Sequence, residues 1–171
     1  MKTTGIFLML ALLALSAVGQ QEPQIPRNEL KINGLYGLLA LPEVSYERII
    51  NTESSWGTSL AFAVDPNYSL KVAVTPYYRW FFSKKPASGF FLEGSGGVFF
   101  VQQDHYYGGW ITETQTVAGG GIGLSLGCKV LSDGGWVGEV YAGLGRNLIS
   151  TDVFGNILPR FGFCLGRRFG S

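Results

Sequence analysis

The chain has 171 residues, 46% of them hydrophobic, and a formal net charge of +1 at pH 7. This near-zero charge argues against a nucleic-acid-binding protein, since such proteins usually carry a basic excess. Glycine is frequent, with 25 residues, about twice its ordinary share of ~7%.

The first residues predict a secretory signal peptide over 1–19. Residues 6–18 form an apolar run, and Ala17 and Gly19 place small residues before a cleavage site. An uncleaved helical anchor is the competing interpretation, but the run is shorter than the ~20 residues that a spanning helix needs. We expect export and cleavage near Gly19, which would leave a short periplasmic lead over 20–28.

From residue 29 onward the sequence predicts eight consecutive β-strands with no helix between them. Apolar residues alternate with small or charged ones along most of these strands, which is the pattern of strands with two different faces. Each strand is long enough to cross a bilayer, and no later stretch resembles a spanning helix. The expected strands lie at 29–39, 42–50, 55–64, 69–82, 89–102, 114–130, 136–148 and 158–169.

The connections between the expected strands alternate in length. Short turns at one end and longer loops at the other are typical of outer-membrane barrels. The connection near 40–42 is an exception, because it is very short although it belongs to the longer set. The short turns are 51–54, 83–88 and 132–135, and the longer loops are 103–113 and 149–157.

One face of the expected strands is large and apolar, and the other is small or charged. Trp136, Val140 and Leu144 share one face, for example, while Glu139 lies on the other. A water-soluble barrel needs apolar residues inside, whereas small and charged residues fit the narrow lumen of a membrane barrel. We therefore expect an all-β, eight-stranded antiparallel up-and-down transmembrane β-barrel over 29–171, located in the bacterial outer membrane.

Aromatic residues at strand ends give an independent indication. Trp56 and Trp136 begin odd-numbered strands, and Trp80 ends an even-numbered one, so an up-and-down barrel places them at one rim. Phe90 and Phe169 join them on the apolar face. Such a girdle is typical of the periplasmic membrane interface. Phe169 also resembles the terminal aromatic residue that the outer-membrane assembly machinery reads.

Charged residues on the opposite face predict an ion-pair network inside the barrel. The interior of an eight-stranded barrel is just filled by its side chains, and buried charges need partners. This network is either a structural plug or the lining of a narrow solute path. It is expected to join Glu47, Glu93 and Glu139 to Arg79, Arg160 and Arg168, with Lys71 and Lys129 facing the same lumen.

The sequence offers little that could carry catalysis or hold a cofactor. His105 is the only histidine and has no serine within its loop, so we expect neither an enzyme nor a metal site. Tyr106, Tyr107 and Trp110 share this loop, and they either contact a partner or anchor the outer interface. Strand parity points Cys128 to lipid and Cys164 to the lumen, which disfavours a disulfide. The remaining expectation is that no cofactor is bound.

Several segments resemble the small Bacteroidota-type outer-membrane barrels, much of whose family has no assigned function. The resemblance implies a fold and a location and no activity. It is carried by Leu30 to Leu35, Val44 to Arg48, Pro76 to Phe81, Gly119 to Gly123, Tyr141 to Gly145 and Leu158 to Phe169.

The sequence thus predicts a monomeric outer-membrane barrel with a structural or surface-interaction role, embedded in outer-membrane lipid. A second interpretation is a narrow channel or transporter for small solutes. A third is a secreted, lipocalin-like barrel that carries a ligand inside, which would require an apolar lumen.

Overall fold

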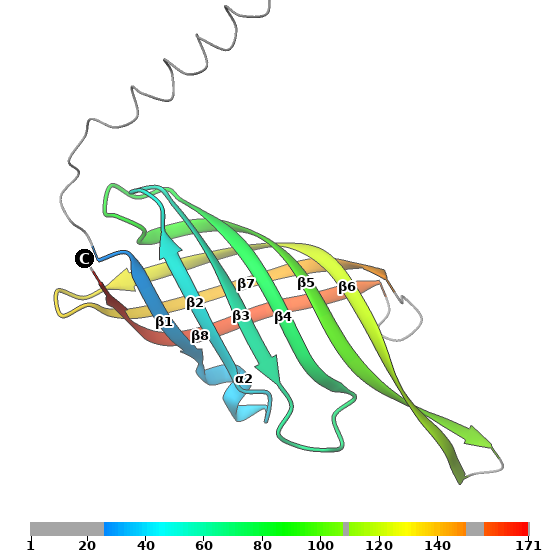
Figure 1. Ribbon diagram of the computed structural model, residues 1–171. Helices are drawn as coiled ribbons and strands as arrows, with labels where there is room; N and C mark the ends of the chain where they lie inside the picture. Colours follow the sequence, from blue (N-terminus) through cyan, green and yellow to red (C-terminus); the bar gives the residue numbers. More distant parts are fainter. Residues whose placement is uncertain (1–25, 108–109, 150–155, 171) are drawn as a thin grey trace, which may run out of the picture.

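The computed structural model describes residues 26–107, 110–149 and 156–170, and for 104–107 and 110–114 it describes the backbone alone. The expected signal peptide lies outside these residues, as do most of the loop expected over 149–157 and most of the expected lead. Figure 1 shows the described elements. They are β1 (Asn28–Asn33), α2 (Gly34–Leu38), β2 (Glu43–Ile49), β3 (Ser54–Phe62), β4 (Leu70–Phe81), β5 (Gly89–Tyr107), β6 (Trp110–Leu131), β7 (Trp136–Ile149) and β8 (Ile157–Phe169).

The eight strands form one closed barrel in which each strand pairs with its neighbours in sequence. β1 closes the barrel by pairing antiparallel with β8, which places Asn28 opposite Phe169. The predicted all-β, eight-stranded antiparallel topology is therefore confirmed. We call the end of the barrel with Asn28 and Phe169 the terminal end, and the end with α2 the distal end (Figure 1).

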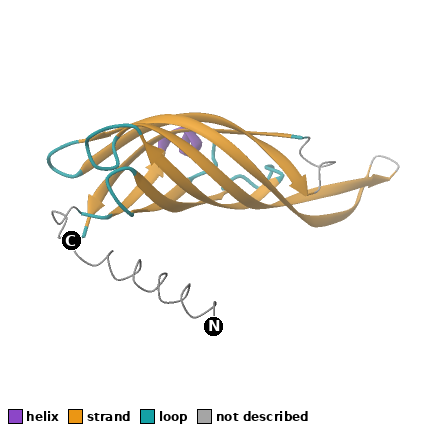
Figure 2. Cartoon of the chain, turned by 90° about the horizontal axis from the view of Figure 1, so that it is seen from above, coloured by secondary structure: helices purple, strands orange, loops and turns teal. Residues whose placement is uncertain are grey.

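Three expectations about the elements are wrong. β1 ends at Asn33, because the Asn33 side chain accepts a hydrogen bond from the Tyr36 backbone and begins a helix of 5 residues. β1 and β2 have only 6 and 7 residues, fewer than the ~9–11 of a spanning strand. The expected loop over 103–113 instead lengthens β5 and β6, with Gln103 opposite Gln115. This hairpin projects beyond the other strands (Figure 2).

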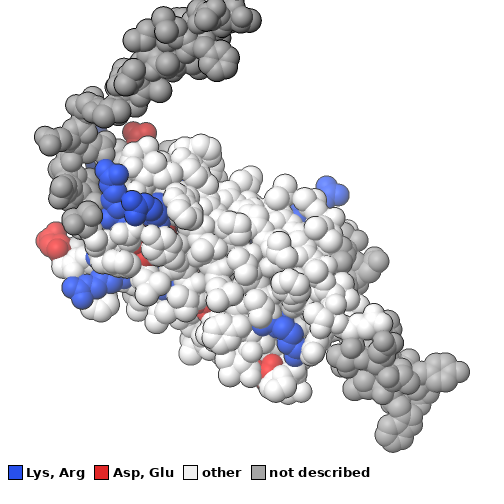
Figure 3. Space-filling view, in the orientation of Figure 1, with Lys and Arg blue, Asp and Glu red and all other residues white. Residues whose placement is uncertain are grey.

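Side chains alternate between the lumen and the outer face along the strands. Glu29, Glu47 and Glu93 are 0% exposed inside the barrel, whereas Leu144 and Trp136 are 64% and 62% exposed outside it. Between its two ends, the side of the barrel in Figure 3 shows few Lys, Arg, Asp or Glu side chains. The described barrel is thus polar inside and apolar outside.

Glycines give the inward aromatic rings room inside this narrow barrel. Four inward rings each lie directly opposite a glycine of the neighbouring strand. A Cβ atom built on Gly57, for example, would lie 2.5 Å from the Tyr77 ring, closer than carbon atoms can approach. These pairs account for part of the high glycine content. They are Gly57 with Tyr77, Gly127 with Phe91, Gly119 with Phe99, and Gly162 with Tyr141.

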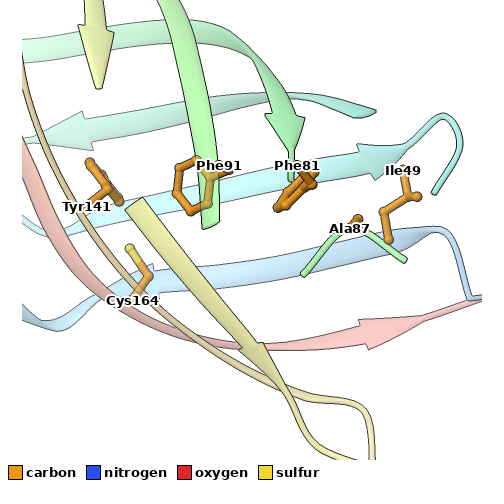
Figure 4. Packing of buried hydrophobic residues seen from close by; sticks show 6 residues of the cluster. All are labelled: Ile49, Phe81, Ala87, Phe91, Tyr141 and Cys164. Atoms are coloured by element: carbon orange, nitrogen blue, oxygen red, sulfur yellow. The ribbon is translucent and has the colours of Figure 1, made fainter. Parts of the chain in front are cut away.

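A small hydrophobic cluster fills the lumen toward the terminal end (Figure 4). Phe81 and Phe91 pack with ring centroids 5.6 Å apart. Ala87, from the turn between β4 and β5, is 0% exposed, so this turn folds across the opening of the barrel. The terminal end is therefore closed by the chain itself. The cluster contains Ile49, Phe81, Ala87, Phe91, Tyr141 and Cys164.

At the distal end, β8 continues beyond the point where β1 ends. We call this part of the barrel wall the seam. β8 extends beyond the level of Asn33 to Ile157 with no β1 partner. The Asn33 amide bridges one step of this seam, since its Nδ2 donates to the Phe161 carbonyl at 3.4 Å and its Oδ1 accepts from the Phe163 amide at 3.3 Å. Farther along, the Tyr36 ring of α2 packs edge-on against the Phe161 ring, 5.3 Å between centroids.

Candidate functional site

Ten charged side chains from seven strands face the described lumen, and their formal charges cancel. β3 contributes Ser55 and Ser59 instead of charges to this set. The equal numbers mean that the interior can be neutral without protonating any acid. The acids are Glu29, Glu43, Glu47, Glu93 and Glu139, and the bases are Lys31, Arg79, Lys129, Arg160 and Arg168.

Arg79 of β4 lies at the centre of this set. Its Nε atom donates to Glu93 at 2.8 Å, and its Nη1 atom donates to Glu47 and Glu139, each at 2.8 Å. Nη2 reaches the second Glu139 oxygen at 3.1 Å. The guanidinium carbon also lies 4.3 Å from the centroid of the Phe91 ring and 4.5 Å from that of Tyr77. One arginine thus links carboxylates from β2, β5 and β7.

Two lysines are further cationic partners of Glu47, which also accepts a hydrogen bond from the Ser55 hydroxyl at 2.6 Å. Lys31 contacts Glu47 directly and also donates to Glu139 at 2.9 Å. Lys129 donates to Glu47 at 2.6 Å and to Glu29 at 2.8 Å. Glu47 therefore accepts hydrogen bonds from three cations, so its desolvated carboxylate is matched by opposite charge.

Arg168 and Arg160 extend the network toward the two ends of the barrel. Arg168 donates to Glu29 at 2.8 Å and to the backbone carbonyls of Pro86 and Ala87, which fixes the β4–β5 turn across the terminal end. Arg160 donates from Nε to Glu93 at 2.7 Å and is the most distal of the bases.

A cavity of about 380 Å³ lies in the distal lumen, beyond the ion pairs. Its walls come mainly from small and apolar inward residues, including Ala61, Ala73 and Phe99, and Arg160 and Glu43 also line it. The lumen therefore has two unlike halves. The terminal half is filled by charged and aromatic side chains, and the distal half is partly hollow.

The structure brings together most of the predicted lumen residues. Glu47, Arg79, Glu93, Lys129, Glu139, Arg160 and Arg168 all belong to the network. The expected partner of Arg168 was wrong, because Arg168 pairs with Glu29. Lys71 is a second correction. A register shift between Leu70 and Val72 breaks the strand alternation there, and the Lys71 ammonium donates to the Pro66 carbonyl outside the network.

Three lumen residues were not predicted from the sequence: Glu29, Lys31 and Glu43. The first two alternate with Leu30 and Ile32, which are 51% and 60% exposed. The same alternation that identified the other lumen charges is present in this segment.

The remaining predicted residues lie at the surface or where the side chains are not described. Of the expected girdle, Trp56, Trp80, Phe90, Trp136 and Phe169 are all exposed on the outer face, toward the terminal end. The backbones of His105, Tyr106, Tyr107 and Trp110 belong to the β5–β6 hairpin, and their side chains lie outside what the structure describes. Cys128 and Cys164 are not joined to each other.

Neither a metal centre nor a spanning helix is found in the described parts of the chain. No group of three His, Cys, Asp or Glu residues there has the arrangement of metal ligands. No described helix is long and apolar enough to cross a membrane.

Comparisons with known proteins add no family assignment. No family model, curated protein or solved structure matches this chain.

Proposed function

We propose that this chain is an integral outer-membrane β-barrel, closed to solutes, with a structural or surface-interaction role. The observation that carries the proposal is the distribution of polarity: paired charges fill the lumen while large apolar side chains cover the outside. A barrel in water would expose this apolar belt at a high cost in free energy, whereas lipid removes that cost.

The exposed aromatic residues support a membrane position. Phe90 is 73% exposed and Trp80 is 54% exposed on the outer face. Rings of this kind are favoured at the level of lipid headgroups. The short turns lie at the same end of the barrel as these rings, so we infer that the terminal end faces the periplasm and the distal end the cell surface. The resemblance to small outer-membrane barrels agrees with a membrane position, and the proposed partners are outer-membrane lipid and the outer-membrane assembly machinery.

The ion pairs favour a closed barrel over a channel. Arg79 is 1% exposed and is held by carboxylates of three other strands. A solute could pass only after these contacts broke, and each buried charge left unpaired costs several kcal/mol. The apolar outer face, together with the charges in the terminal half of the lumen, disfavours a secreted lipocalin-like carrier, because that fold needs a polar surface and an apolar interior.

Reconstitution into liposomes and planar bilayers tests this proposal. The refolded protein should float with the liposomes in a density gradient, and a planar bilayer that contains it should show no single-channel steps. Glu93→Gln should also be silent, because Arg79 keeps Glu47 and Glu139 as partners. Defined conductance steps in the wild type would support the channel, and protein left at the bottom of the gradient would support a soluble barrel.

A further inference from the structure

The distal cavity has the dimensions of a site for a small organic molecule. Its volume of about 380 Å³ lies within the ~300–1,000 Å³ of ligand sites. Eight-stranded barrels are just wide enough to hold one small ligand when side chains do not fill them. Here the inward residues Ala61, Ala73, Gly97 and Gly121 leave that space empty.

The polar groups of the cavity are few and complementary. Arg160 uses its Nε for Glu93, and no other hydrogen bond of its guanidinium is found among the described residues. Its side chain keeps 13% exposure inside the barrel. Glu43 accepts a hydrogen bond from the Tyr141 hydroxyl at 3.4 Å and takes part in none of the ion pairs within 4.0 Å in the described chain. The cavity thus offers free N–H donors beside a carboxylate acceptor.

The charge balance of the lumen selects a neutral ligand. The ten buried charges already cancel, so a charged ligand would bring an uncompensated charge into a region of low dielectric, at a cost of several kcal/mol. A hydroxyl or a primary amide avoids this cost. Either group accepts from Arg160 and donates to Glu43 at the same time.

The seam beside β8 provides a way into the cavity from the flank of the barrel. Backbone groups of alternate strand residues face the same neighbour, so Pro159 faces the β1 side, as Phe161 and Phe163 do. Proline has no N–H to donate and is confined to strand edges. Both Pro159 and Tyr36 of α2 line the cavity, which therefore reaches this open edge.

We propose that the distal cavity binds a single neutral amphiphile: an alkyl chain that ends in a hydroxyl or amide group placed between Arg160 and Glu43. The chain would lie against the apolar wall formed by residues such as Ala73, Phe99 and Leu158. The site is argued from the geometry of the lumen. Its test in a lipid bilayer rests on the membrane barrel proposed above, which the flotation experiment checks separately.

Photolabelling of the full folded barrel in lipid nanodiscs tests this site. The probe is 1-decanol with a diazirine on the chain, and labelled residues are identified by peptide mass spectrometry. Labels should concentrate on the inward residues of β4, β5 and β8 and should be removed by excess 1-decanol or decanamide. Decanoate and decylamine should compete at least ~100-fold less well, because each carries an unpaired charge into the lumen. Labels spread evenly over the outward residues would overturn the proposal.

Variants that fill the cavity separate binding from partition into lipid. Ala73→Phe and Ala61→Phe place a ring in the cavity from two different strands and should each abolish the inward labels. The matched control is Ala142→Phe, which adds the same ring on the exposed outer face of β7. It should leave the inward labels unchanged. Inward labelling that persists in both cavity variants would contradict the site, provided that each variant still runs as a folded species on an unheated gel.

A single change of charge tests the chemistry of the polar end. Glu43→Gln removes a carboxylate and gives the set of lumen charges a net charge of +1, while Arg160 stays paired with Glu93. The potency of decanoate as a competitor, relative to that of 1-decanol, should therefore rise at least ~100-fold. An unchanged order of competitors in Glu43→Gln would contradict the placement of the head group.

Discussion

Arg79 is the residue on which the interior of the barrel depends most. It is 1% exposed and contacts Glu47, Glu93 and Glu139, which come from three other strands. Its guanidinium geometry matters as well as its charge, because five N–H donors in a planar fork can serve several carboxylates at once. A lysine at this position could not make the same set of contacts.

Replacing Arg79 with methionine should therefore destabilise the barrel by about 3–5 kcal/mol, because it leaves one buried negative charge of the network uncompensated, although Glu47, Glu93 and Glu139 each keep another cationic partner. The matched control is Arg48→Met. Arg48 lies exposed on the outer face, where it donates to Asn28, and its loss should cost less than ~1 kcal/mol. Urea unfolding in phospholipid vesicles, followed by tryptophan fluorescence, measures both. Equal losses in the two variants would show that the network adds nothing to stability.

Residue faces could be predicted from the sequence wherever the alternation is regular. The lumen-facing positions of Glu139 and Arg79 can be predicted from strand alternation alone, because successive side chains of a strand point to one of only two faces. Lys71 could not be placed in this way, since the register shift at Leu70 is a local event without a signal in the residue types. The pairing of Arg168 with Glu29 follows from the closure of β1 on β8, which places the two residues opposite each other. It was not predicted because Glu29 was not among the expected lumen residues.

At the level of the elements, α2 and the distal half of β8 form the weakest part of the wall. There β8 pairs with β7 but has no partner strand on its β1 side. The Asn33 side chain and the packing of Tyr36 on Phe161 connect β8 to β1 and α2 on that side. The sequence predicts a strand over 29–39, whereas β1 ends at Asn33. The cap at Asn33 is a common signal for a helix start, but a helix of 5 residues is too short for periodicity to reveal.

Asn33→Ala should loosen this seam without opening the barrel. The change removes the cap of α2 and both bridges to β8, so it should cost ~1 kcal/mol. Amide hydrogen exchange should become faster at Tyr36 and Phe163. Asn51→Ala is the control, since Asn51 makes a comparable set of bonds in the β2–β3 turn at the terminal end. It should make amide exchange faster at Glu53 and leave exchange at Tyr36 and Phe163 unchanged. Unchanged exchange at Phe163 in Asn33→Ala would contradict the bridging role.

The β5–β6 hairpin shows a second limit of reasoning from sequence. The segment 103–113 was expected to be a loop because it is polar and contains Gly108 and Gly109. Its backbone nevertheless pairs as far as Tyr107 and Trp110. Strand length there is set by pairing between β5 and β6 alone.

At the scale of the whole molecule, the central feature is a barrel that is apolar outside and charged inside. The count and topology of the strands could be predicted because every strand after β2 repeats the same two-faced pattern. The hollow distal half could not, since it depends on how far the inward side chains reach across the lumen. The proposed membrane barrel therefore depends on contact between the outer face and lipid.

The most direct test is electrophoretic mobility of the membrane fraction with and without boiling. The full chain would be expressed in a Gram-negative host and extracted from the outer membrane with detergent. A closed barrel with paired interior charges should stay folded in sodium dodecyl sulfate, migrate as a compact species when unheated, and shift after boiling. Protein recovered in the soluble fraction with one mobility under both conditions would contradict the account.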